Sequence, residues 1–264
     1  MILNSILADT RAALPARMAA MPPSALWERI EELPPPRDFA AALRRPGVSI
    51  IAEIKRASPS KGVLNPDLAP DKLAVAYAEA GAAAISVLTE EHHFGGRLAD
   101  LGATRRALDA AGFACPLLRK DFVIDPYQLL EARAWGADAV LLIAAALDDE
   151  TLATLLDGTL ELGLWPLVEV HNQAELARVL PLSPPVIGIN NRNLYDFTVD
   201  LETTRRLRPQ APLGSVVVSE SGIHSPDQVR VLKAIKVDAA LIGEALVTAA
   251  DPAGMLRALC EAGR

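Results

Sequence analysis

The sequence has few of the residues that form disulfides or metal sites. Its 264 residues include only two cysteines, Cys115 and Cys260, which lie far apart, and four histidines, none of which is paired at the spacing of a metal-binding motif. A chain of this length can bury a large core without cross-links. We therefore expect reduced cysteines, no disulfide scaffold and no metal site.

Clustered basic charge and long apolar runs are also missing. The 26 basic and 33 acidic residues give a net charge of −7, and the basic residues are scattered, which argues against a nucleic-acid-binding protein. The longest uncharged apolar run, 139–147, is far shorter than the roughly 18 residues that a membrane span needs. The N-terminal residues also lack the pattern of a secretory signal. These absences indicate a cytoplasmic protein with no nucleic-acid or membrane partner.

Eight short apolar runs alternate with segments of helical periodicity. The runs are 48–54, 83–88, 116–118, 139–143, 166–170, 186–189, 216–218 and 239–242. The helical segments are 71–81, 97–111, 126–135, 149–163, 173–180, 201–207, 226–235 and 252–262. Eight such units predict an α/β fold, a closed (β/α)8 TIM barrel over residues 48–264. An open doubly wound sheet is the alternative, but no GxGxxG motif follows the first run.

The first 47 residues do not follow this alternation. Segments 2–19 and 24–32 have the pattern of amphipathic helices, and three consecutive prolines at 34–36 end the second one. We predict that residues 1–47 form an N-terminal helical extension that caps one end of the barrel. A loosely attached arm is the alternative.

Charged and amide side chains lie at or just after the ends of five of the apolar runs. Because side chains alternate along a strand, residues two positions apart, such as Glu53 and Lys55, share one face. Each of these residues alone could belong to an ordinary ion pair or a strand end, but burying all of them without a function is costly. The carboxyl ends of the strands therefore predict a catalytic site. The candidates are Glu53, Lys55, Lys120, Glu169, Asn190 and Glu220.

Small residues follow the last two runs, where barrels often bind phosphate. Ser219-Glu220-Ser221-Gly222 and Ile242-Gly243-Glu244 allow backbone N–H groups to approach an anion. A serine-rich loop at 58–62 adds hydroxyls and a cation. Tight turns at the glycines and a mobile loop at 58–62 are the alternatives. The predicted anion site consists of Ser58, Ser221, Gly222, Gly243 and the backbone of Glu244.

Six motifs together resemble the indole-3-glycerol-phosphate synthases. They are EIKRASPSKG at 53–62, ISVLTE at 85–90 with FGG at 94–96, RKDF at 119–122, LVEVH at 167–171, GINNRNL at 188–194 and SESGI at 219–223. They occur in the family's order from about residue 46 to 250. The resemblance implies the ring-closing and decarboxylating step of tryptophan biosynthesis, a carboxy-lyase reaction. It converts 1-(2-carboxyphenylamino)-1-deoxyribulose 5-phosphate into indole-3-glycerol phosphate and needs no cofactor.

The resemblance also assigns roles to the charged residues. Lys120 would be the general acid of ring closure, and Glu169 would stabilise the developing cation or take a proton. Lys55 would be the acid of dehydration, with Glu53 as base or orienting partner.

The remaining residues would bind the substrate. Asn190 and Arg192 would hold sugar hydroxyls and the substrate carboxylate, and Glu220 another hydroxyl. The apolar slot for the anthranilate ring would consist of Phe94, Phe122, Leu141 and Leu194, for which core packing is the alternative.

Other functions stay open at this point. Phosphoribosylanthranilate isomerase and thiazole-forming synthases are also phosphate-binding barrels, and Lys120 makes Schiff-base chemistry formally possible. A barrel that only binds a partner would not need so many charged strand ends. We expect one phosphorylated small-molecule substrate and a monomer or weak homodimer.

Overall fold

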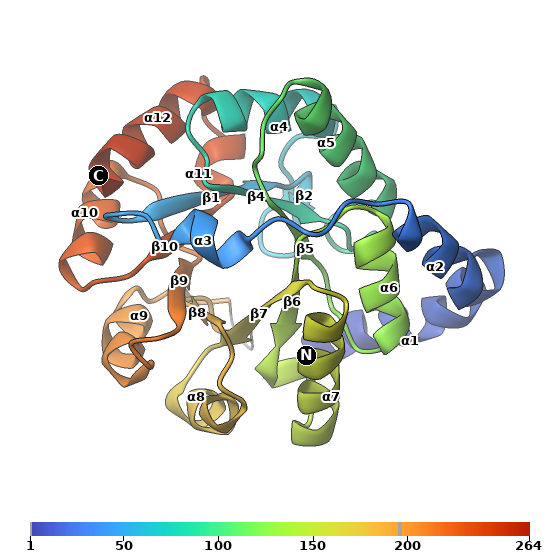
Figure 1. The fold of residues 1–264 in the computed structure, drawn as a ribbon. Helices are drawn as coiled ribbons and strands as arrows, with labels where there is room; N and C mark the ends of the chain where they lie inside the picture. Colours follow the sequence, from blue (N-terminus) through green and yellow to red (C-terminus); the bar gives the residue numbers. More distant parts are fainter. Residues whose placement is uncertain (1, 195–196) are drawn as a thin grey trace.

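The computed structural model describes residues 2–194 and 197–264, and in them eight parallel strands close into a barrel (Figure 1). Around the barrel each strand pairs with its neighbour in the chain, and the last strand pairs with the first. The strands are β1 (Ser49–Ile54), β4 (Ala84–Leu88), β5 (Leu117–Lys120), β6 (Ala139–Ile143), β7 (Trp165–Val170), β8 (Val186–Asn190), β9 (Val216–Glu220) and β10 (Ala239–Ile242). The predicted TIM barrel is confirmed.

Helices connect consecutive strands and surround the barrel. They are α4 (Pro70–Glu79), α5 (Leu98–Ala110), α6 (Pro126–Ala134), α7 (Asp149–Glu161), α8 (Gln173–Val179), α9 (Glu202–Leu207), α10 (Pro226–Ala234), α11 (Glu244–Val247) and α12 (Pro252–Gly263). Short 3-10 helices lie at η1 (Ala144–Ala146), η2 (Leu180–Leu182) and η3 (Arg208–Gln210). Asp or Ser side chains cap several of these helices at a proline-containing first turn, as at Asp125, Ser225 and Asp251.

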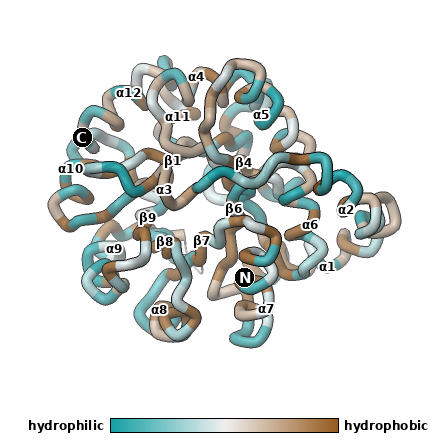
Figure 2. The backbone as a smooth tube through the Cα atoms, viewed as in Figure 1, coloured by the Kyte–Doolittle hydropathy of each residue, from teal (hydrophilic) through white to brown (hydrophobic). Residues whose placement is uncertain are grey.

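Apolar side chains fill two layers of the molecule. One cluster lies inside the barrel and includes Ile51, Leu118 and Leu167. A larger cluster lies between the strands and the helices, where every second strand residue points outwards. In Figure 2 the outer helices carry both hydrophobic and hydrophilic residues, as expected of helices with one buried face. This rigid frame fixes the carboxyl ends of the strands, where polar residues replace apolar ones.

The N-terminal extension contains α1 (Ile2–Ala20), α2 (Pro23–Glu31) and α3 (Phe39–Leu43). In Figure 1, α3 lies in front of the ring of strands, and Phe39 and Leu43 pack on the apolar cluster inside the barrel. At the opposite end, Ile2 and Ile6 of α1 line a cavity at the carboxyl ends of the strands. The extension thus contacts both ends of the barrel, whereas the sequence predicts contact with one.

Some elements differ from the predicted ones. Strands β5 and β9 continue to Lys120 and Glu220, because their polar ends pair with neighbouring strands inside the barrel. A small hairpin of β2 (Ala57–Ser58) and β3 (Gly62–Val63) lies in the loop after β1, and its strands are too short to show periodicity in the sequence. Of the helices in residues 2–194 and 197–264, none combines the length and the hydropathy of a bilayer-crossing segment.

Candidate active site

Lys120 lies at the centre of the carboxyl ends of the strands. Its Nζ is 3.3 Å from Oε2 of Glu169 at the end of β7 and 3.4 Å from Oε2 of Glu220 at the end of β9. The side chains of all three residues are largely buried. Because β5, β7 and β9 converge inside the barrel, three residues that are about 50 positions apart form one charged cluster.

These charges shift one another's titration. Burial would lower the pKa of Lys120, but Glu169, Glu220 and Glu53 outweigh it and raise the pKa above its usual value. Burial would raise the pKa of Glu169, but Lys120 and His171 hold it well below the usual range. For Glu220, burial and the adjacent Glu169 outweigh Lys120 and raise the pKa to about 8. At neutral pH the cluster thus holds one ammonium, one carboxylate and one mostly protonated carboxyl group.

A second ion pair lies beside this cluster at the end of β1. Nζ of Lys55 is 2.7 Å from Oε1 of Glu53, whose side chain is 6% exposed. Two glycines provide the space for the carboxylates. A Cβ at Gly243 would overlap with Oε1 of Glu53, and a Cβ at Gly188 would overlap with Oε1 of Glu220. Any larger residue at either position would displace one of these two carboxyl groups.

Hydroxyls and basic groups gather at one side of the cavity. Nη1 of Arg192 lies 3.4 Å from Oγ of Ser60, and its Nη2 lies 3.8 Å from Oε2 of Glu244. Nζ of Lys61 is 3.6 Å from Oε1 of Glu244. Ser58 is buried beside Ser60. Of these groups, Arg192 and the hydroxyls of Ser58 and Ser60 line the cavity and can bind an anion there, while the more exposed Lys61 lies outside its lining.

The turn after β9 has a backbone conformation that brings it close to this region. Ser221 and Gly222 have positive φ values of 65° and 79°. A Cβ at Gly222 would overlap with Val199, so glycine is needed here for both space and conformation. The tight turn that was the alternative to anion binding is therefore present at Gly222. Such a turn does not prevent its backbone from also binding an anion.

Apolar side chains also line the cavity. The rings of Phe94 and Phe122 are 6.2 Å apart, and Leu141 and Leu194 line the same space. Residues of α1 complete the wall. All sixteen residues proposed from the sequence line this one cavity, which encloses about 1120 Å³ including the part open to solvent.

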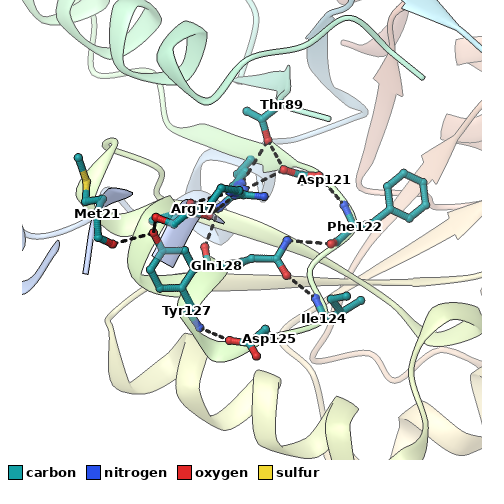
Figure 3. Close-up of polar contacts among 11 residues, drawn as sticks. Arg17, Met21, Thr89, Asp121, Phe122, Ile124, Asp125, Tyr127 and Gln128 are labelled. Carbon is teal, nitrogen blue, oxygen red and sulfur yellow. Dashed lines mark hydrogen bonds and ion pairs between the residues drawn. The ribbon is translucent and has the colours of Figure 1, made fainter. Parts of the chain in front are cut away.

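A network of polar contacts surrounds the residues that flank Lys120 in the sequence (Figure 3). Arg119, the residue before Lys120, is fully buried and donates to Asp121, Thr89 and Glu131. Glu131 also accepts from Nε of Arg17 in α1 at 2.9 Å. The side chains of residues 119 and 121 thus point into the helical layer, while Lys120 between them points into the barrel.

Three groups at the site were not predicted from the sequence. His171 lies between Glu169 and Glu175, although the spacing of Asn172 and Glu175 at a helix start was a visible capping signal. The Arg119 network was indicated by three consecutive charged residues, 119–121, at the end of β5, which cannot all face the cavity. The contribution of α1 had no local signal, because helix docking depends on tertiary packing.

A closed eight-stranded barrel whose carboxyl ends carry buried lysines and carboxylates defines the class of (β/α)8-barrel enzymes. Solved structures that resemble the chain share this fold. A 3-hexulose-6-phosphate synthase aligns with a TM-score of 0.64 at 17% identity, over 82% of this chain and 100% of that one. A thiamine phosphate pyrophosphorylase from Pyrococcus furiosus aligns with a TM-score of 0.61 at 18% identity, over 83% and 96%. At such identities the likeness shows the fold alone.

Sequence comparison identifies the family. The family model for indole-3-glycerol phosphate synthase matches residues 3–259. Proteins of that name from Roseiflexus castenholzii and Dehalococcoides mccartyi are 52% and 47% identical to this chain. The alignments cover 98% of this chain and 97% and 100% of the two relatives. The chain belongs to the indole-3-glycerol phosphate synthase family, a family of carboxy-lyases of tryptophan biosynthesis.

Proposed function

We propose that this chain converts 1-(2-carboxyphenylamino)-1-deoxyribulose 5-phosphate into indole-3-glycerol phosphate, with release of carbon dioxide and water. The observation that carries the proposal is the placement of Lys120 between Glu169 and Glu220, inside a cavity with an anion-binding side and an apolar wall. The substrate needs both, because it combines a phosphate with an aromatic ring.

Ring closure uses Lys120 as the general acid. The ring carbon that bears the carboxylate attacks the ribulose carbonyl, and Lys120 donates a proton to the carbonyl oxygen. The raised pKa of Lys120 keeps it protonated for this step. Attack leaves a positive charge on the ring and amine, which the ionised Glu169 stabilises. Loss of carbon dioxide then restores the aromatic ring.

Dehydration uses the pair at the end of β1. Lys55 donates a proton to the departing hydroxyl, and Glu53 takes a proton or orients Lys55 through the 2.7 Å contact. Glu220 is mostly protonated at neutral pH and can donate to a sugar hydroxyl or to Glu169. The loss of water forms the indole double bond.

The phosphate binds where small and basic residues meet. Ser58, Ser221, Gly222, Gly243 and the backbone of Glu244 line that side of the cavity. Asn190 and Arg192 hold the sugar hydroxyls and the substrate carboxylate. Phe94, Phe122, Leu141 and Leu194 contact the anthranilate ring.

The test is a fluorescence assay for indole product with the synthetic carboxyphenylamino substrate. We expect the wild-type chain to turn over and Lys120→Ala to lose activity while it keeps its fold and much of its substrate affinity. Near-normal activity of Lys120→Ala would refute the acid assignment. Borohydride with substrate tests the Schiff-base alternative, since a covalent adduct on Lys120 would refute proton transfer as its role.

We also propose that the chain acts in the cytoplasm as a monomer or weak homodimer. Every residue assigned above comes from one chain, so the site needs no partner subunit. Light scattering at increasing protein concentration tests the oligomeric state. A stable higher oligomer would contradict this expectation.

A further inference from the structure

His171 lies between two carboxylates at the end of β7. Its Nε2 is 3.2 Å from Oε1 of Glu169, and its Nδ1 is 3.0 Å from Oε2 of Glu175 in α8. The imidazole is 8% exposed. The other oxygen of Glu169, Oε2, lies 3.3 Å from Nζ of Lys120. Charged groups therefore alternate in sign from Lys120 to Glu175 through Glu169 and His171.

The positions of the two carboxylates favour the protonated imidazole. A neutral imidazole has one N–H group, and its other nitrogen would direct a lone pair at a carboxylate. The imidazolium instead turns a positively charged N–H group towards each carboxylate, with Nδ1 hydrogen-bonded to Glu175 and Nε2 at ion-pair distance from Glu169 without a hydrogen bond of regular geometry. Glu175 is itself held in place, because its Oε2 accepts from the backbone N–H of His171 at 2.8 Å and its Oε1 accepts from Nδ2 of Asn172 at 2.6 Å.

We propose that His171, held by Glu175, is a positioning residue that fixes one oxygen of Glu169 so that the other faces Lys120 and the substrate. The inference rests on the function proposed for Glu169. His171 touches no reacting atom in this arrangement. It sets the orientation of the carboxylate that stabilises the cation formed in ring closure.

The groups around His171 agree with a permanent positive charge there. Glu169 faces it from β7 and Glu175 from α8, while Lys120 of β5 lies beyond Glu169 and Asn190 of β8 helps to lower the pKa of the same carboxylate. Burial disfavours the cation, but the two adjacent carboxylates outweigh it and raise the pKa of His171 to about 10. The imidazolium thus persists across the physiological range.

Two substitutions separate the contacts of His171. In His171→Gln the amide nitrogen takes the place of Nε2 and can still donate to Glu169. In His171→Asn the shorter amide can reach only Glu175. We expect His171→Asn to lower kcat by about 10- to 100-fold with KM changed less than about threefold, because a misoriented carboxylate impairs the transition state more than binding. His171→Gln should recover part of this loss. His92→Gln, at an exposed histidine outside the cavity, is the matched control and should behave as wild type.

Nitrogen NMR of histidine-labelled wild-type protein provides a readout that does not depend on any variant's folding. We expect one imidazole to stay doubly protonated above pH 8, and its titration to move to lower pH in Glu175→Gln. A neutral His171 at pH 7 would overturn the inference. So would His171→Asn with the kcat of the control, or equal losses of kcat in both variants that match a loss of thermal stability.

Failure of the proposed function gives a different result. In that case the wild-type chain does not convert the carboxyphenylamino substrate at all, whereas the NMR titration of His171 still shows whether the imidazolium bridges the two carboxylates.

Discussion

The space beside Glu53 allows a sharp test of the catalytic geometry. Gly243 has φ −125° and ψ −58°, so its backbone is not in the left-handed conformation that favours glycine. The added Cβ, however, would lie at 3.0 Å from Cβ and Cδ of Glu53 and closer still to Oε1. The same oxygen forms the ion pair with Nζ of Lys55 at 2.7 Å. Gly243→Ala must therefore displace the carboxylate that holds Lys55.

The expected size of the effect follows from this displacement. Ordinary contact begins near 3.4 Å, so Oε1 must move by on the order of 1 Å, and Glu53 is 5% exposed with little room to do so. A misplacement of about 1 Å costs about 100-fold in rate, which corresponds to about 2.7 kcal/mol. Overpacking should lower the free energy of unfolding by about 1–3 kcal/mol.

The assay is kcat and KM for indole formation, together with thermal unfolding. Gly214→Ala is the control, because no atom lies within 4 Å of its added Cβ. If the loss acts through Glu53, Gly243→Ala should cost much less activity in a Glu53→Gln background than in the wild type. Equal costs in the two backgrounds, or wild-type kcat/KM in Gly243→Ala, would refute the reasoning.

Two further predictions concern Glu220 and α1. The pKa of Glu220 is raised to about 8, so the folded state keeps a proton that the unfolded chain releases near pH 4.5. The contribution of Glu220 to the free energy of unfolding therefore falls as the pH rises from about 4.5 to 8. Glu220→Gln should therefore gain stability relative to wild type across that window, as chemical denaturation at several pH values can show; a constant difference would contradict the shift. Arg17→Ala removes one of the two arginines on Glu131 and should cost about 1 kcal/mol and a few degrees in Tm while raising KM more than it lowers kcat. An unchanged KM would argue against coupling between α1 and the cavity.

Much of the fold could be predicted because barrel strands are buried on both faces. Their apolar runs are separated by regular helical segments, and both patterns are local. Strands β5 and β9 were predicted to end too early, because Lys120 and Glu220 resemble loop residues in the sequence. In the barrel both residues pair with a neighbouring strand and are largely buried. The short helix α3 follows three prolines and has no periodicity long enough to detect.

The charged residues that line the cavity could be predicted from the sequence, but the residues that hold them in place could not. Period-two alternation places Glu53 with Lys55, and the strand order of a barrel brings Lys120 close to Glu169. The pairing of His171 with Glu169 depends on a side-chain direction at the end of β7 that alternation alone leaves open. The roles assigned to the individual residues remain predictions until the variants are measured.

The two anchoring points of α1 have a thermodynamic consequence. Ile2 and Ile6 line the cavity, while Arg17, three turns later in the same helix, is held by Glu131. If occupancy of the cavity favours the docked helix, docking must favour occupancy by the same factor, because linkage is reciprocal. Amide protons of this first helix should accordingly exchange with deuterium more slowly when a substrate analogue saturates the protein.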